Sequence, residues 1–182
     1  MIKLKNKRII NLLSFCLLAL VIFANTFFSI KNFGVIEQFD IIQKKLPLFT
    51  NSFVIVFLTS IQVIVGITVV IIETLFVTFI TNFIANKKLN FSNFLSVIIF
   101  SNISSILLNM TVIWIVGLNN LQDLEWLGWS PGSQMLLSGF VYLYLSNLND
   151  SISNRLKVKI SVIIFSITYG LTFIIQMLMT FV

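Results

Sequence analysis

Long apolar stretches separated by short polar breaks occupy this chain from Ile9 to Val182. The composition agrees, because 58% of the residues are hydrophobic, 10% are charged and the mean hydropathy is +1.03. A helix of about 20 apolar residues is long enough to cross the hydrocarbon core of a bilayer. The sequence therefore predicts an all-α bundle of transmembrane helices, which forms a single membrane domain over residues 1–182.

The polar breaks divide the chain into five predicted membrane spans, at approximately residues 9–30, 52–84, 94–116, 134–148 and 158–182. The fourth of these is short for a complete crossing. It is kept because, without it, the basic residues that follow it would lie on the opposite side of the membrane from the other basic clusters.

Two connecting segments differ in composition from the predicted spans. Residues 31–50 combine apolar residues at helical spacing with several charges, which is typical of an amphipathic helix lying on the outer surface of the bilayer. Residues 117–133 contain two acids, no base and a Pro-Gly turn, and are predicted to form an outer loop. In that loop Trp126 and Trp129 are the predicted interfacial anchors.

Basic residues indicate the orientation, because Lys and Arg are enriched in short cytoplasmic segments. With five spans and a cytoplasmic N-terminus, nine of the twelve basic residues lie inside, namely Lys3, Lys5, Lys7, Arg8, Lys87, Lys88, Arg155, Lys157 and Lys159. Only Lys31, Lys44 and Lys45 lie outside. The sequence therefore predicts a cytoplasmic N-terminus and an external C-terminus.

The composition also excludes several classes of function. The chain has no histidine, so sites that need one, such as a Ser-His dyad or an HExxH zinc site, are impossible. The single cysteine, Cys16, cannot form an internal disulfide. The basic residues flank the spans rather than forming a folded patch, which does not indicate nucleic-acid binding. We expect a protein that is not an enzyme and has no cofactor or metal.

Polar side chains inside the spans are the candidates for a functional site. Helical spacing places such residues on one face of each of three spans, and we expect these faces to meet in a polar seam. The seam comprises Gln62, Glu73, Asn102, Ser105, Asn109, Thr172 and Gln176. Two interpretations remain open: hydrogen bonding between packed helices, or a polar path or ligand site along the bundle axis.

Glu73 is the only ionisable residue within the predicted second span. An acid at the centre of a bilayer is costly and indicates a function, whereas an acid near the headgroups is tolerated. Its depth depends on which part of residues 52–84 lies in the bilayer. We expect a structural or interfacial position.

The junction between the second and third spans resembles that of the Yip-type membrane proteins of low-GC Gram-positive bacteria. That family typically has a small or glycine pair, a Ser/Thr-Phe step and then LxSVxxYSxxPxLL. The matching segments here are Phe91-Ser92-Asn93-Phe94-Leu95-Ser96-Val97 and Phe100-Ser101-Asn102-Ile103. Lys87-Lys88, Phe100 and Ile103 stand where the family has the glycines, the Tyr and the Pro.

The resemblance implies a five-span protein of the bacterial cytoplasmic membrane, with a cytoplasmic N-terminus and no enzymatic activity. Some bacterial relatives accompany ABC exporters or help protect cells against toxic peptides. The first hypothesis is therefore a non-catalytic accessory protein, either the partner of an exporter subunit or an immunity factor against antimicrobial peptides. It predicts a filled bundle centre and a small-residue or aromatic docking face.

The alternative is the substrate-binding membrane component of an importer for a small solute of the vitamin type. This hypothesis predicts an outward-facing pocket lined by Trp126, Trp129, Asn109 and Glu73. Under either hypothesis the lipid bilayer is a partner. The sequence does not identify a small-molecule ligand.

Overall fold

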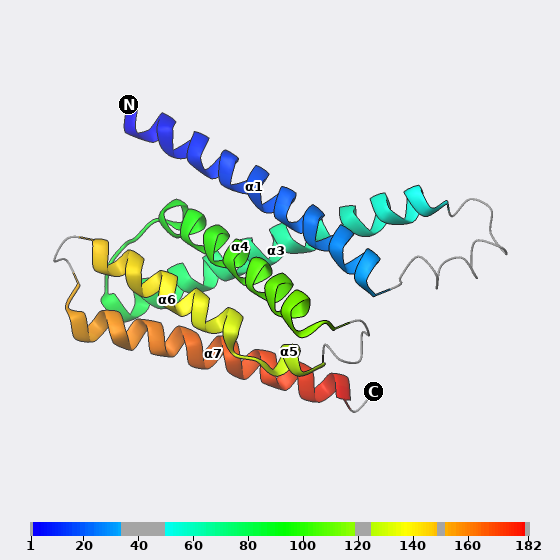
Figure 1. The fold of residues 1–182 in the computed structure, drawn as a ribbon. Helices are drawn as coiled ribbons and strands as arrows, with labels where there is room; N and C mark the ends of the chain where they lie inside the picture. Colours follow the sequence, from blue (N-terminus) through cyan, green and yellow to red (C-terminus); the bar gives the residue numbers. More distant parts are fainter. Residues whose placement is uncertain (1, 34–49, 119–124, 149–151, 181–182) are drawn as a thin grey trace.

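A computed structural model describes residues 2–33, 50–118, 125–148 and 152–180 (Figure 1). Within these ranges all regular structure is helical and no strand is present, which confirms the predicted all-α class for this part of the chain. The helices are α1 (Ile2–Asn32), α3 (Asn51–Ala85), α4 (Phe91–Val116), α5 (Glu125–Trp129), α6 (Gly132–Asn147) and α7 (Asn154–Thr180).

Four of these helices are long and apolar enough to cross a membrane, which is typical of a multi-pass membrane protein. Their apolar segments are Ile9–Asn32, Ser52–Ala85, Phe91–Val116 and Asn154–Met179. They contain most of the first, second, third and fifth predicted spans. The predicted amphipathic helix over residues 31–50 lies mostly outside the described residues, which include only 31–33 and 50 of this range.

The fourth predicted span corresponds to α6, which has 16 residues. At about 1.5 Å per residue it is roughly 24 Å long, shorter than a hydrocarbon core of about 30 Å. It nevertheless packs inside the bundle against α4 and α7.

Local signals in the sequence set the helix ends. Thr50 caps α3, where its hydroxyl accepts a hydrogen bond from the Phe53 amide over 3.2 Å. The same helix ends at Asn86, which adopts the left-handed conformation with φ 50°. Asn82 then exchanges two hydrogen bonds with the backbone of Leu89, at 2.7 and 3.0 Å, so its side chain closes the tight turn into α4.

Hydrogen bonds near the helix ends define how the helices run. Asn11 donates to the Ser92 hydroxyl over 3.3 Å, and Asn32 donates to the carbonyl of Leu118. The part of α1 around Asn11 therefore lies beside the beginning of α4, the ends of the two helices lie together, and the helices run roughly parallel (Figure 1). The end of α3, the beginning of α4, the end of α6 and the beginning of α7 lie at one end of the bundle (Figure 1). These helix ends carry or flank Lys87, Lys88, Arg155, Lys157 and Lys159.

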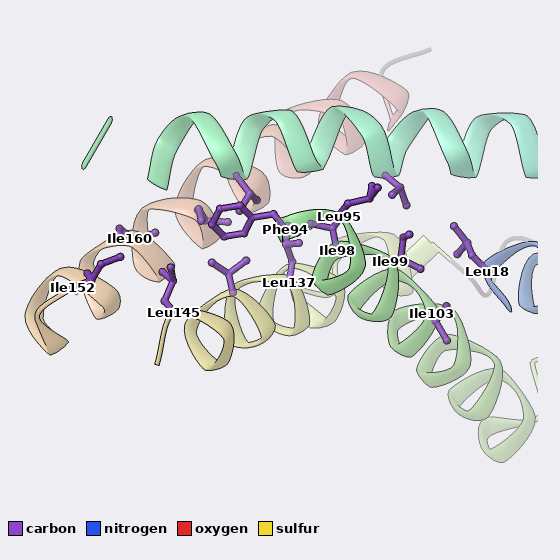
Figure 2. Packing of buried hydrophobic residues seen from close by; sticks show 14 of the residues in the cluster. Leu18, Phe94, Leu95, Ile98, Ile99, Ile103, Leu137, Leu145, Ile152 and Ile160 are labelled. Carbon is purple, nitrogen blue, oxygen red and sulfur yellow. The ribbon is translucent and has the colours of Figure 1, made fainter. Parts of the chain in front are cut away.

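Buried apolar side chains from α1, α3, α4, α6 and α7 form one continuous cluster (Figure 2). Phe94, Ile98 and Ile99 of α4 lie at its centre and are fully buried. One close approach extends this packing between α1 and α3, because a Cβ atom on Gly66 would lie 2.6 Å from Cδ1 of Ile22. The glycine therefore lets these two helices pack close together.

The beginning of α6 lies deep within the bundle rather than at its outer end. Ser133, in the first turn of α6, hydrogen-bonds through its hydroxyl to that of Ser105. Ser105 is about eleven residues, or roughly 17 Å, from the end of α4. The preceding short helix, α5, packs along the last part of α7. Irregular backbone at such a depth is tolerated where protein surrounds it or where it lines a cavity.

Candidate functional site

A cavity of about 270 Å³ lies between α3, α4, α6 and α7. Its lining is mixed, with eight polar and four apolar residues. The polar lining residues are Glu73, Ser101, Asn102, Ser105, Ser133, Gln134, Thr168 and Thr172, and the apolar ones are Ile72, Phe76, Leu137 and Leu171. Four residues of the predicted polar seam therefore share one cavity: Glu73, Asn102, Ser105 and Thr172.

Glu73 is held by a single short hydrogen bond. Asn102 Nδ2 donates to Glu73 Oε2 over 2.6 Å and also donates to the carbonyl of Ile98 over 3.0 Å. A carbonyl can only accept, so this second bond fixes which end of the Asn102 amide faces the carboxyl group. Asn102 lies near the middle of α4, and Glu73 therefore lies near mid-depth of the bundle. The structural or interfacial role that we expected for Glu73 stays a prediction.

A second hydrogen-bonded chain joins α6 to α7. Gln134 Nε2 donates to the Thr172 hydroxyl over 2.9 Å, and that hydroxyl donates to the carbonyl of Thr168 over 3.0 Å. Because the Thr172 proton is already used, its oxygen can only accept from Gln134. This fixes the orientation of the Gln134 amide. The Gln134 Oε1 atom is buried and has no donor among the described residues.

The remaining residues of the predicted seam lie elsewhere. Gln62 Oε1 accepts from the Thr26 hydroxyl over 2.6 Å, so this part of α3 faces α1. Gln176 packs against α5, where a Cβ atom on Gly128 would lie 2.5 Å from its Nε2 atom. Asn109 does not line the cavity. The three polar faces that we expected to meet in one seam are therefore divided among the cavity, the α1–α3 contact and the α5–α7 contact.

The predicted tryptophan anchors also lie away from the cavity. Trp129 packs edge-to-face on Phe173, with ring centroids 5.2 Å apart, and its carbonyl accepts from the Tyr169 hydroxyl over 3.4 Å. Trp126 is 48% exposed. Neither ring lines the cavity, in contrast to the pocket that we predicted for an importer component.

Four polar residues of the lining are not part of the predicted seam: Ser101, Ser133, Gln134 and Thr168. Ser133 and Gln134 directly follow Pro131-Gly132, and the sequence pattern placed them at the border of the outer loop and the fourth span. Two polar residues that open a short apolar helix directly after a Pro-Gly turn were the available signal. A helix that begins inside the bundle brings such residues to the depth of a membrane-embedded site.

The cavity opens on the side of the bundle. Ile72 of α3 and Leu171 of α7 are the most exposed lining residues, at 59% and 55%. These two residues place apolar side chains of α3 and α7 at the outer edge of the cavity. In a bilayer this edge faces the lipid chains.

No family model, no curated protein and no solved structure matches this chain. The resemblance to the Yip-type proteins therefore stays a prediction.

Proposed function

We propose that this protein is a non-catalytic membrane protein that binds a small ligand in the cavity between α3, α4, α6 and α7. In this role it is a ligand-binding membrane component of a solute transport system. The cavity itself carries the proposal, because it combines a carboxyl group, amides and hydroxyls with apolar side chains. Ligand sites in proteins are mostly apolar and contain a few convergent polar groups.

The test is to isolate the protein from native membranes and identify bound small molecules by mass spectrometry. Ser105→Phe places a ring into the cavity, whereas Asn109→Phe makes the same change one helical turn along α4, away from it. We expect a bound small molecule in the unmodified protein and in Asn109→Phe, and its loss by about tenfold in Ser105→Phe. Equal recovery from both variants, or no bound molecule in any sample, contradicts the proposal.

A second candidate is the accessory or immunity function beside an ABC exporter. The observation that favours it is an aromatic face on α3, where Phe79 and Phe83 stack with centroids 6.2 Å apart and are 66% and 78% exposed. A docking face of this kind is what that hypothesis predicts. A membrane protein partner that co-purifies in stoichiometric amount, with no small molecule bound, favours this second function.

We further propose five crossings, with α6 as the fourth, in a bacterial cytoplasmic membrane with the N-terminus inside. Support comes from the basic residues of the α3–α4 and α6–α7 connections, which lie at the same end of the bundle (Figure 1). The positive-inside rule assigns that end to the cytoplasm. The Yip-type resemblance implies the same orientation.

Cysteine labelling tests this orientation. On a Cys16→Ser background, we introduce Lys88→Cys, Arg155→Cys or Glu125→Cys and treat intact cells with a membrane-impermeant maleimide. We expect Glu125→Cys to react directly, and the other two to react only after the membrane is permeabilised. If Lys88→Cys and Arg155→Cys react from opposite sides, α6 does not cross and the five-span arrangement is wrong.

A further inference from the structure

Most hydrogen-bond donors of the polar residues that line the cavity already have acceptors within the protein. Both protons of the Asn102 amide are used, one on Glu73 and one on the carbonyl of Ile98. The hydroxyls of Thr168 and Thr172 donate to carbonyls of their own helix. Among the described residues, the donors of the lining to which no acceptor is assigned are the hydroxyls of Ser101 and Ser133 and one amide proton of Gln134.

Acceptors, in contrast, are left over. Asn102 satisfies Glu73 Oε2, and Oε1 of the same carboxyl group has no donor among the residues that the structure describes. The buried Gln134 Oε1 atom is also without one. An acceptor that is buried without a donor, as Gln134 Oε1 is, is costly, so the site favours a ligand that donates hydrogen bonds.

The charge of the lining residues also favours a ligand that donates hydrogen bonds, in particular a cation. Glu73 is the only acidic residue among those that line the cavity, and the lining contains no Lys or Arg. A carboxylate at membrane depth is ordinarily paired with a cation or protonated. Because the protein provides no basic partner in the lining, the ligand can provide the positive charge.

The apolar residues at the outer edge of the cavity indicate what the ligand carries beyond its headgroup. Ile72 and Leu171 flank a route from the lipid side of the bundle to Glu73. An amphiphile can therefore lie with its headgroup at Glu73 and its chain between α3 and α7, continuing into the bilayer. The cavity of about 270 Å³ is larger than the space that a single water needs, which leaves room for a compact headgroup.

A bare metal ion fits this site less well. Hard cations require about six to eight oxygen ligands at roughly 2.0–2.6 Å, in a compact arrangement. Here Glu73 is the single charged ligand, and Phe76 and Leu137 occupy part of the wall. The lining is therefore suited to an organic cation.

We propose that the cavity binds a singly charged alkylammonium amphiphile, which enters between α3 and α7 and places its nitrogen at the Glu73 carboxylate. This inference rests on the proposed ligand-binding function and names the chemical class of its ligand. An amine supplies a positive charge for the Glu73 carboxylate and N–H groups that can donate to it and to Gln134 Oε1.

Photolabelling tests the proposal with the full chain in phosphatidylcholine nanodiscs. The probe is a twelve-carbon primary alkylamine with a diazirine in its chain, and the matched probe is the corresponding alcohol. We expect the amine to label α3 and α7 near Ile72 and Leu171, and excess unlabelled dodecylamine to compete with it. In Glu73→Gln this competed labelling falls by about tenfold, and in Glu73→Asp it is largely retained.

The outcomes separate this inference from the proposed function. Equal labelling of the unmodified protein and a folded Glu73→Gln variant, or equal labelling by amine and alcohol, overturns the ammonium proposal and leaves ligand binding standing. Absence of competed labelling by the amine also overturns it. The proposed function falls only if Ser105→Phe and Asn109→Phe give the same result in the isolation experiment.

Discussion

Replacing Phe94 by alanine is expected to lower the free energy of unfolding by about 3 kcal/mol. The Phe94 side chain is fully buried at the centre of the apolar cluster (Figure 2). Its ring packs edge-to-face on Tyr144 of α6, with centroids 5.2 Å apart and an angle of 65° between the planes. The substitution therefore removes contacts between α4 and α6 and leaves a cavity where the two helices meet.

The size of this effect depends on packing rather than on transfer from water. Lipid chains are as apolar as the protein interior, so little hydrophobic driving force separates helices within a membrane. The van der Waals contacts and the cavity therefore account for most of the expected loss, and we take the lower end of the range for Phe→Ala changes in protein cores.

Reversible unfolding in mixed micelles measures this prediction. The matched control is Phe100→Ala on the same helix, because Phe100 is 43% exposed and faces the outside of the bundle. We expect the control to change the free energy of unfolding by less than about 1 kcal/mol. Similar losses from both variants would mean that α4 does not bury Phe94 against α6.

Most of the helices could be predicted from hydropathy alone, because a bilayer demands long apolar segments with all backbone groups paired. The second span, predicted over residues 52–84, corresponds closely to α3 at Asn51–Ala85. The position of α6 could not be predicted in this way. Its 16 residues begin deep in the bundle, and only contacts with Ser105 and Thr172 reveal that depth.

The candidate site was predicted only in part, for a physical reason. Helical spacing identifies which residues of one helix share a face, but it does not identify the neighbour of that face. On α3, Gln62 contacts Thr26 of α1, whereas Glu73 contacts Asn102 of α4. These two positions are about eleven residues, or roughly 17 Å, apart along the helix, and over that distance α3 changes partners.

Replacing Asn102 by leucine is expected to lower the free energy of unfolding by about 2 kcal/mol. Asn102 is the one donor that the structure gives to the Glu73 carboxyl group among the described residues, over 2.6 Å. Leucine has a similar volume and no polar atom, so the change removes the hydrogen bond with little loss of packing. Glu73 is then left in the bundle without a hydrogen-bond partner from α4, which is the costly outcome for a buried polar group.

A double-mutant cycle shows whether the loss comes from this hydrogen bond. Removing both polar partners costs less than removing one, so we expect Glu73→Leu combined with Asn102→Leu to be more stable than Asn102→Leu alone. Asn109→Leu on the same helix serves as the control, because Asn109 lies outside the cavity. If the two leucine substitutions at Asn102 and Asn109 have equal effects, or if the cycle is additive, the contact between Glu73 and Asn102 does not stabilise the bundle. Hydrogen bonds between membrane helices average about 0.6 kcal/mol. A coupling energy between Glu73 and Asn102 above about 1 kcal/mol would therefore show that this hydrogen bond stabilises the packing of α3 on α4.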